Sequence, residues 1–130
     1  LEHLRVLHAP WATLFYHDPE PSLAKIKGMM AIGENELPLV WNHKSGRKSL
    51  VLGNTAQSVV GKSPSESALI LHGLRDWATS DQFTYSHEWE VGDMVIWDNT
   101  GTVHRAEWYD PDCGRMMHRT ILKGGEAWDQ

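Results

Sequence analysis

The chain has 130 residues, a formal net charge of −5 and a single cysteine, Cys113. This length suits one domain with a modest core. The acidic balance argues against a general nucleic-acid-binding surface or a surface for anionic membranes. One cysteine excludes an internal disulfide and fits a reducing cytosol. Because there is no long apolar run and no signal-peptide pattern, the sequence predicts a cytoplasmic protein that does not associate with membranes.

The first segment, residues 1–36, is predicted to be a loop or lid region. Its opening, LEHLRVLH, carries leucines at helical spacing, which would suit the last turns of a helix. From Ala9 to about Leu37, proline and glycine recur without sustained hydrophobic periodicity. A long loop of this kind in a small domain is usually a lid or a binding segment.

The middle of the chain predicts a hairpin followed by a helix. LPLVW and SLVLG flank a turn with Ser45 and Gly46 at its tip, which indicates two paired strands. A helix is expected over residues 64–79, because Ser63 can cap it and Glu66 stands where a capping box requires it. Its apolar face is predicted to cover the outside of a sheet. That face consists of Ile70, Leu71, Leu74, Trp77 and Ala78.

The closing part of the chain predicts further strands, in the segments FTYSHEWE, MVIWD, TVHRAEW and RMMHRTIL. Several short strands with a helix before them favour an antiparallel barrel or jelly roll over a parallel βαβ fold. We therefore expect a mainly β fold with one or two helices in a single domain over residues 1–130. Within it, residues 37–130 would form the barrel strands together with helix 64–79.

Three side chains near the end of the chain are candidates for chemistry. Strand alternation would place Arg115 and Arg119 on one face. If that face is buried, both guanidinium groups need anionic partners, and their planar forks suit a carboxylate or a sulfonate. Alternatively, both arginines are exposed or paired with acidic side chains. His104 is open to two interpretations as well, since a single histidine on a strand is either a metal ligand or an ordinary core or surface residue.

A family resemblance bears on these alternatives. WDNTGTVHRAEWYDPDCGRMMHRT, together with FTYSHEWEVGDMVIWDN, SPSESALILHGL and LVWNHKSGRKSLVLG before it, resembles the closing region of the TauD/TfdA branch of Fe(II)/2-oxoglutarate-dependent dioxygenases. The resemblance covers roughly residues 37–122. It implies a partial double-stranded β-helix, or jelly roll, of the 2-oxoglutarate oxygenase type. The implied cofactors are Fe(II) and 2-oxoglutarate, with O₂ as cosubstrate.

The same resemblance implies roles for particular residues. His104 matches the distal iron ligand, and Arg115 matches the arginine that binds the far carboxylate of 2-oxoglutarate. Arg119 matches the arginine that commonly meets the anionic group of the prime substrate. Ala56 aligns near an aromatic residue that lies beside the substrate in the taurine enzyme, so a roomier pocket is expected here, which argues against taurine itself. The expected substrate is a small organic anion such as a sulfonate, a sulfate ester or an aryloxy or other carboxylate.

One part of the family pattern is absent. The other two iron ligands form a His-x-Asp or His-x-Glu motif, and none of the histidines before His104 begins one. Because the chain also begins at Leu1, we expect a truncated form or fragment with negligible turnover by itself. A half barrel leaves an apolar face uncovered, so we expect a homo-oligomer. The alternative is a non-catalytic jelly-roll module that binds anions or serves in assembly.

Overall fold

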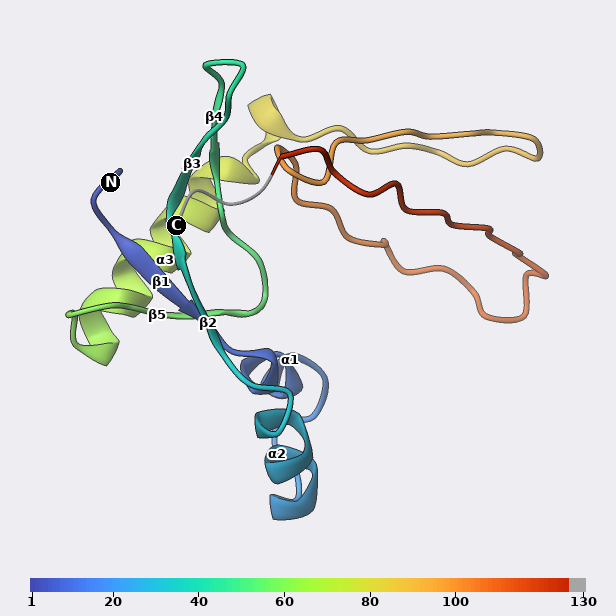
Figure 1. Cartoon of the computed structure of the whole chain (residues 1–130). Coiled ribbons are helices and arrows are strands. Elements are labelled where there is room, and N and C mark those ends of the chain that lie inside the picture. The colour runs from blue at the N-terminus through green and yellow to red at the C-terminus, as the bar shows by residue number, and fades with distance from the viewer. Residues whose placement is uncertain (127–130) are drawn as a thin grey trace.

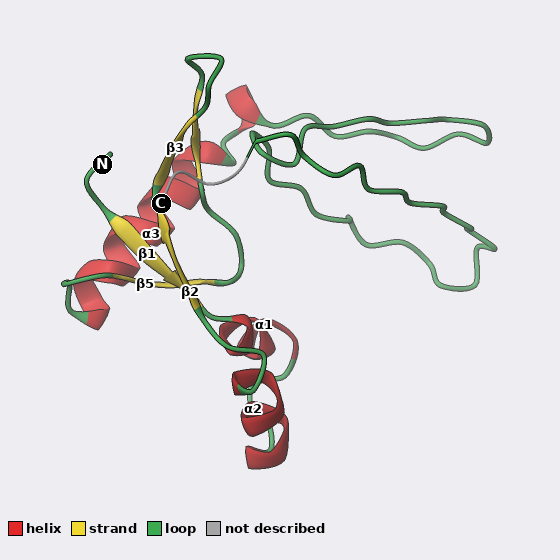
Figure 2. Cartoon of the chain, viewed as in Figure 1, coloured by secondary structure: helices red, strands yellow, loops and turns green. Residues whose placement is uncertain are grey.

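The computed structural model describes residues 1–126, so the last four residues of the predicted domain, 127–130, lie outside the described part. Its helices and strands are concentrated in the first two thirds of the chain (Figures 1 and 2). In chain order they are β1 (Arg5–His8), η1 (Pro10–Thr13), α1 (Leu14–His17), α2 (Leu23–Met30), β2 (Asn35–Pro38), β3 (Val40–Asn42), β4 (Lys48–Leu50), β5 (Ala56–Val59), α3 (Pro64–Ala78) and η2 (Asp81–Phe83).

Strand β1 lies in the middle of a three-stranded antiparallel sheet with the order β2-β1-β5. Val6 stands opposite Leu37 of β2 on one side and Val59 of β5 on the other. The prediction of a helix end in the opening segment was therefore wrong. The segment is a strand because it pairs with a neighbour on each side, which outweighs the weak helical spacing of its leucines. Val6 and His8 point into the interior, and Arg5 is exposed.

The segment predicted as a loop or lid, residues 1–36, contains helices η1, α1 and α2 as well as strand β1 and the start of β2. Helix α2 begins at a cap, where the Ser22 hydroxyl accepts a hydrogen bond from the backbone N–H of Lys25 at 3.4 Å. An ion pair of 2.7 Å joins Lys25 to Asp18 ahead of the helix. No residue of α2 is buried, and none takes part in the hydrophobic core.

The predicted hairpin is confirmed. Strands β3 and β4 pair antiparallel, with Val40 opposite Leu50 and Asn42 opposite Lys48. Gly46 at the tip has a φ of +84°, a conformation that glycine adopts without steric cost. Each of these two strands has three residues. Their pairing reaches into the predicted turn at Asn42 and Lys48 and does not cover all of LPLVW and SLVLG.

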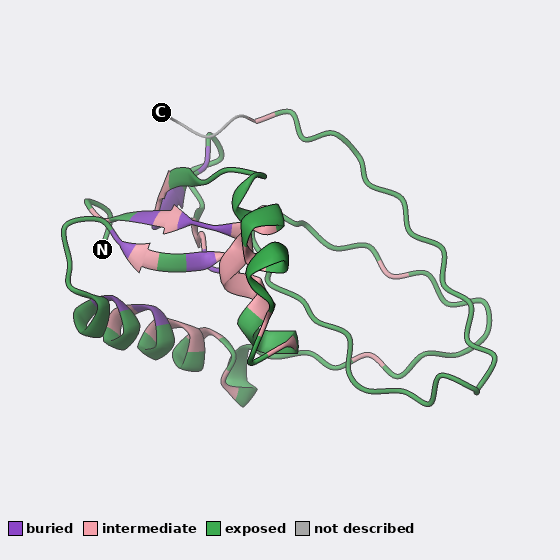
Figure 3. Cartoon of the chain, turned by 90° about the horizontal axis from the view of Figure 1, so that it is seen from below, coloured by how far each residue is buried: buried purple, intermediate pink, exposed green. Residues whose placement is uncertain are grey.

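Helix α3 is also confirmed, including the capping box between Ser63 and Glu66. It lies along the sheet with its buried residues on the side that faces the strands (Figure 3). One of them, Leu71, belongs to the hydrophobic cluster between the helix and the sheet. Trp77 differs from its predicted place on the apolar face, since it is 56% exposed and packs its ring against Phe83 at 4.7 Å. The cluster consists of Val6, Leu39, Leu52, Ala56, Val59 and Leu71.

Residues 84–126 form no helix or strand and extend as long arms away from the packed region (Figures 1 and 2). The four strands predicted in this part are therefore not formed. A strand is stable only when a neighbour pairs with its backbone and covers its apolar face, and neither occurs along these arms. Large apolar side chains are exposed here as a result. They include Val91, Met94, Ile96, Trp108, Met116, Ile121 and Leu122.

The described chain thus has few helices and two small antiparallel sheets, whereas the closed jelly roll is not formed by residues 1–126. None of the described helices is long and apolar enough to span a lipid bilayer.

Candidate functional site

Two of the predicted site residues meet at one indole ring. The ring of Trp97 lies 4.9 Å from the ring of His104, centroid to centroid. The guanidinium carbon of Arg119 lies 5.6 Å from the centroid of the same indole. The sequence predicted that Arg115 and Arg119 would share one face of a strand. Neither lies in a strand, and the structure instead brings Arg119 close to His104 at the ring of Trp97.

Arg115 lies over a different aromatic ring. Its guanidinium carbon is 4.4 Å from the centroid of Tyr109, within the range of a cation–π contact. Arg115 and Arg119 are both exposed, and neither forms an ion pair within residues 1–126. Of the two interpretations drawn from the sequence, the arginines are exposed rather than buried. Their N–H groups are free to bind an anion.

The turn that leads to His104 is attached to the β3–β4 hairpin by Arg47. The Nη2 atom of Arg47 donates to Asp98 Oδ2 at 2.6 Å and to Thr100 Oγ1 at 3.1 Å. Hydrogen bonds from Thr100 and from Arg47 hold the pKa of Asp98 well below its usual value. A Cβ atom on Gly101 would lie 3.1 Å from the guanidinium carbon of Arg47, so glycine leaves the space that this arginine occupies.

A second chain of hydrogen bonds runs from the hairpin to the same turn. The Ser49 hydroxyl donates to the carbonyl of Thr100 at 2.7 Å and also contacts His43 Nε2 at 2.8 Å. His43 is buried, and its Nδ1 atom lies 3.3 Å from Glu126 Oε2. These contacts connect the hairpin to the turn and to the last described residue.

Arg47 was missed by sequence reasoning, although a signal was available. Arg47 and Asp98 both lie in segments that carried the family resemblance. Arg47 is also a cation at a hairpin tip with few local partners, which indicates a partner elsewhere in the chain. The 51 residues between Arg47 and Asp98 conceal their contact from any local pattern.

Ala56 is separate from the group around Trp97. It is buried in β5 and belongs to the hydrophobic cluster. It also lines a hollow of about 330 Å³ with Tyr16 and His72, and neither His104 nor the two arginines line that hollow.

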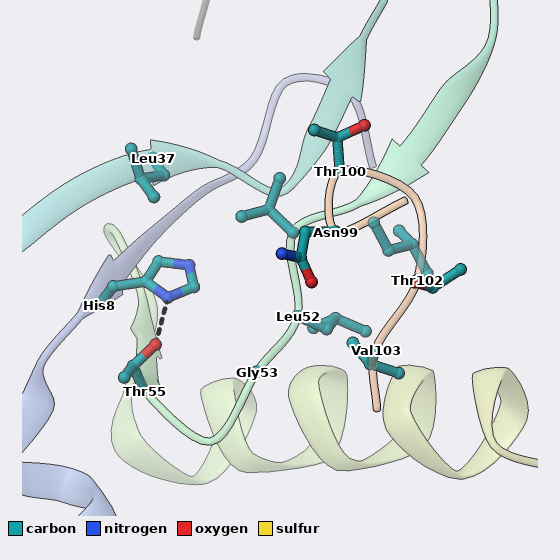
Figure 4. Close-up of a pocket in the computed structure, with 11 residues that line it drawn as sticks. His8, Leu37, Leu52, Gly53, Thr55, Asn99, Thr100, Thr102 and Val103 are labelled. Carbon is teal, nitrogen blue, oxygen red and sulfur yellow. Dashed lines mark hydrogen bonds between the residues drawn. The ribbon is translucent and has the colours of Figure 1, made fainter. Parts of the chain in front are cut away.

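A second cavity, of about 250 Å³, lies between the sheet and the turn before His104 (Figure 4). His8 and Thr55 line it from the side of the sheet, while Asn99 and Val103 line it from the turn. Sequence reasoning gave neither His8 nor Asn99 a role in binding.

The described residues do not complete an iron site. Nowhere in residues 1–126 do three histidine, cysteine, aspartate or glutamate side chains gather closely enough to hold a metal ion. Pairs of such side chains do occur, namely His87 with Asp93 at 2.9 Å and His43 with Glu126 at 3.3 Å. A site of two histidines and one carboxylate needs more ligands than His104 supplies.

The comparisons with known proteins establish the family. The family model described as "Taurine catabolism dioxygenase TauD, TfdA family" matches residues 2–121, and the chain belongs to this family. Enzymes of this family are dioxygenases that depend on 2-oxoglutarate and use Fe(II). The family suggested by the sequence is thereby confirmed.

Similar proteins include "(S)-phenoxypropionate/alpha-ketoglutarate-dioxygenase" from Delftia acidovorans, 41% identical over 67% of this chain and 30% of that protein. "Alkylsulfatase" from Acinetobacter baylyi is 39% identical over 70% of this chain and 29% of its own length. A crystal structure of a "putative alpha-ketoglutarate dependent 2,4-D dioxygenase" from Burkholderia xenovorans aligns with a TM-score of 0.65 and 37% identity, over 77% of this chain and 38% of that one. The chain spans about a third of the length of these relatives.

Proposed function

We propose that this chain forms the C-terminal part of the jelly-roll active site of an Fe(II)- and 2-oxoglutarate-dependent dioxygenase. The observation that carries the proposal is the contact of His104 and Arg119 with one indole, that of Trp97. This contact brings together an imidazole and a permanent cation, which are the groups that such a site needs for a metal and for an anionic molecule.

Each proposed role uses chemistry that the residue already has. His104 would be a metal ligand, and Arg115 would bind the far carboxylate of 2-oxoglutarate. Arg119 would bind the anionic group of the prime substrate. The guanidinium carbons of Arg115 and Arg119 lie over aromatic rings, at 4.4 Å and 5.6 Å from the ring centroids. A cation–π contact of this kind uses no N–H group as a hydrogen-bond donor, so these groups can bind an oxyanion. Ala56 would leave room beside the substrate.

The proposed substrate is a small organic anion, such as a sulfonate, a sulfate ester or an aryloxy carboxylate. The names of two relatives support this range, since phenoxypropionate carries a carboxylate and an alkyl sulfate carries a sulfate. A guanidinium fork binds either kind of oxyanion. Arg119 therefore indicates that the substrate is negatively charged and does not identify the rest of its structure.

A second candidate is a non-catalytic module that binds anions or serves in assembly. It is favoured by the lack of any three-residue metal-binding group in the described part of the chain. Both candidates predict negligible succinate formation when the 130-residue chain is incubated with Fe(II), 2-oxoglutarate and a substrate anion. Succinate released by the chain alone would contradict this expectation.

A chimera separates the two candidates. The matching 88-residue segment of the Delftia acidovorans enzyme is replaced by the corresponding residues of this chain, and succinate formation is measured with (S)-phenoxypropionate. The dioxygenase proposal expects turnover that is lost on His104→Ala. Arg115→Gln should raise the KM for 2-oxoglutarate, and Arg119→Gln should raise the KM for the substrate, each by about tenfold or more because a charged hydrogen bond is removed.

Arg105→Gln is the matched control, because Arg105 is an exposed arginine close to His104 in sequence and pairs only with Glu107 in the described structure. It should leave both KM values unchanged. A folded chimera without turnover would favour the anion-binding module. Equal effects of all three arginine substitutions would contradict the assigned roles.

We also propose that the chain acts in the cytoplasm and associates with itself. The single cysteine supports the first expectation. The large apolar side chains exposed along residues 84–126 support the second, since contiguous apolar surface favours association. Sedimentation velocity at increasing concentration tests it, and a monomer at all concentrations would contradict it.

A further inference from the structure

The cavity between the sheet and the turn before His104 has polar atoms at two opposed positions (Figure 4). His8 approaches it from β1, and Asn99 approaches it from the turn that Arg47 attaches to the hairpin. The cavity volume of about 250 Å³ is sufficient for a small organic molecule.

His8 presents an unpaired ring nitrogen to this cavity. The residue is only 9% exposed, and its Nδ1 atom lies 2.9 Å from the Thr55 hydroxyl, which fixes the ring. Its Nε2 atom is buried without a hydrogen-bond partner among the described residues. A buried polar atom without a partner is costly, so a ligand that pairs with Nε2 would recover that free energy.

The imidazole is neutral near pH 7. Burial lowers the pKa of His8, and the nearby carbonyl of Val51 opposes this shift to a smaller extent. When the Thr55 hydroxyl donates to Nδ1, Nε2 carries the hydrogen and is a donor.

Asn99 determines which partner fits. Its Oδ1 atom accepts a hydrogen bond from Trp97 Nε1 at 2.8 Å. Because an indole N–H can only donate, the oxygen of the amide faces Trp97 and the NH₂ group remains available. Figure 4 shows the amide nitrogen of Asn99 on the side toward His8. The ligand must therefore offer a hydrogen-bond acceptor.

The walls of the cavity determine the charge of the ligand. Much of the lining is aliphatic, from Leu37, Leu50, Leu52 and Val103, and no lysine, arginine, aspartate or glutamate lines it. An ion placed here would lose its hydration without gaining a counter-charge. A neutral molecule with an apolar body avoids that cost.

We propose that this cavity binds a small neutral organic molecule whose carbonyl or hydroxyl oxygen accepts hydrogen bonds from the Asn99 amide and from His8 Nε2. The site differs from the arginine sites proposed above in the charge it accepts. It does not depend on the dioxygenase assignment, because none of its donors is a proposed metal or anion ligand.

The test uses the whole 130-residue chain and three five-membered-ring probes of similar shape. Cyclopentanone carries the neutral acceptor, cyclopentane lacks it, and cyclopentanecarboxylate carries a charge. Nitrogen-15 NMR follows the ring nitrogens of His8 and the side-chain amide of Asn99. Cyclopentanone should shift both sets of resonances in a saturable way, whereas the resonances of the exposed His3 should not move. Cyclopentane and the carboxylate should each bind about tenfold more weakly, as expected from the loss of a hydrogen bond and from desolvation of a charge.

Variants sharpen the test. Asn99→Leu should weaken cyclopentanone binding about tenfold and leave cyclopentane binding unchanged, while the control His3→Gln should alter neither. No saturable shift of His8 by cyclopentanone would overturn the proposal, and so would carboxylate binding as tight as ketone binding. If Asn99→Leu does not fold, the three probes on the unmodified chain still decide the outcome.

Discussion

Residues 4–78 and residues 84–126 are both rich in apolar side chains, yet only the first region packs them. In the first region, Leu71 of α3 closes over Val6 and Val59 of the sheet. In the second region, Met94 and Ile96 are each 82% exposed. The difference therefore lies in the available partners and not in hydrophobicity.

The packed region can cover its apolar groups from its own elements. Helix α3 lies over the sheet, and each edge of β1 is paired. The extended region has the alternating pattern of strands but no neighbouring strand within the described residues. Apolar burial contributes to stability only where a second surface excludes water, so a strand pattern without a partner remains extended and exposed.

The largest expected effect is on the free energy of unfolding, when one apolar side chain is shortened in each region. Leu71→Ala should lower the free energy of unfolding by about 2–5 kcal/mol, because it removes a buried side chain and leaves a cavity. Ile96→Ala should change it by less than about 0.5 kcal/mol, since that side chain is already exposed. Urea unfolding followed by circular dichroism measures both, and similar losses would contradict the contrast between the regions.

A smaller effect concerns the start of α3. Ser63→Ala removes the hydroxyl that accepts from the Glu66 N–H and should cost roughly 1 kcal/mol of unfolding free energy. Ser65→Ala is the control, because the Ser65 hydroxyl makes no bond to the helix backbone in the described structure. Equal losses in the same urea assay would mean that the cap contributes little.

The ion pair between Arg47 and Asp98 joins the two regions, and its contribution to stability should be smaller still. A double-mutant cycle with Arg47→Ala and Asp98→Asn should give a coupling free energy of about 0.2–1 kcal/mol, because the pair is half exposed. The more exposed pair, Arg105 and Glu107, is the control and should give a coupling close to zero. Urea unfolding of the four proteins in each cycle measures these values, and a coupling at Arg47 no larger than at Arg105 would argue against the attachment.

The pH dependence is the subtlest expected effect, and we predict only its direction. The folded state lowers the pKa of His8 below its usual value of 6.5, so the unfolded chain binds the proton more readily. Stability should therefore be greatest above pH 6.5 and fall as the pH drops from there toward the lower pKa of the folded state. Urea unfolding from pH 8 to pH 5 measures this slope. His8→Gln should reduce it and His3→Gln should not, whereas an unchanged slope in His8→Gln would assign it to another group.

The sequence predicted the features whose causes are local. The capping box at Ser63, the turn at Gly46 and the motif that contains His104 each depend on residues a few positions apart, so their patterns can be recognised in the chain itself. The family resemblance rests on the order of several such motifs along residues 37–122, and the match over residues 2–121 confirms the family.

Only the tertiary structure decided which patterns would find partners. Strand β1 forms because β2 and β5 pair with it from positions roughly 30 and 50 residues away, and Arg47 finds Asp98 across 51 residues. The cavity beside His8 and Asn99 likewise depends on segments that are far apart in the sequence. Pairing and burial are non-local, so a segment with helical leucine spacing yields a strand at Val6, and a segment predicted as a strand yields an exposed arm at Ile96.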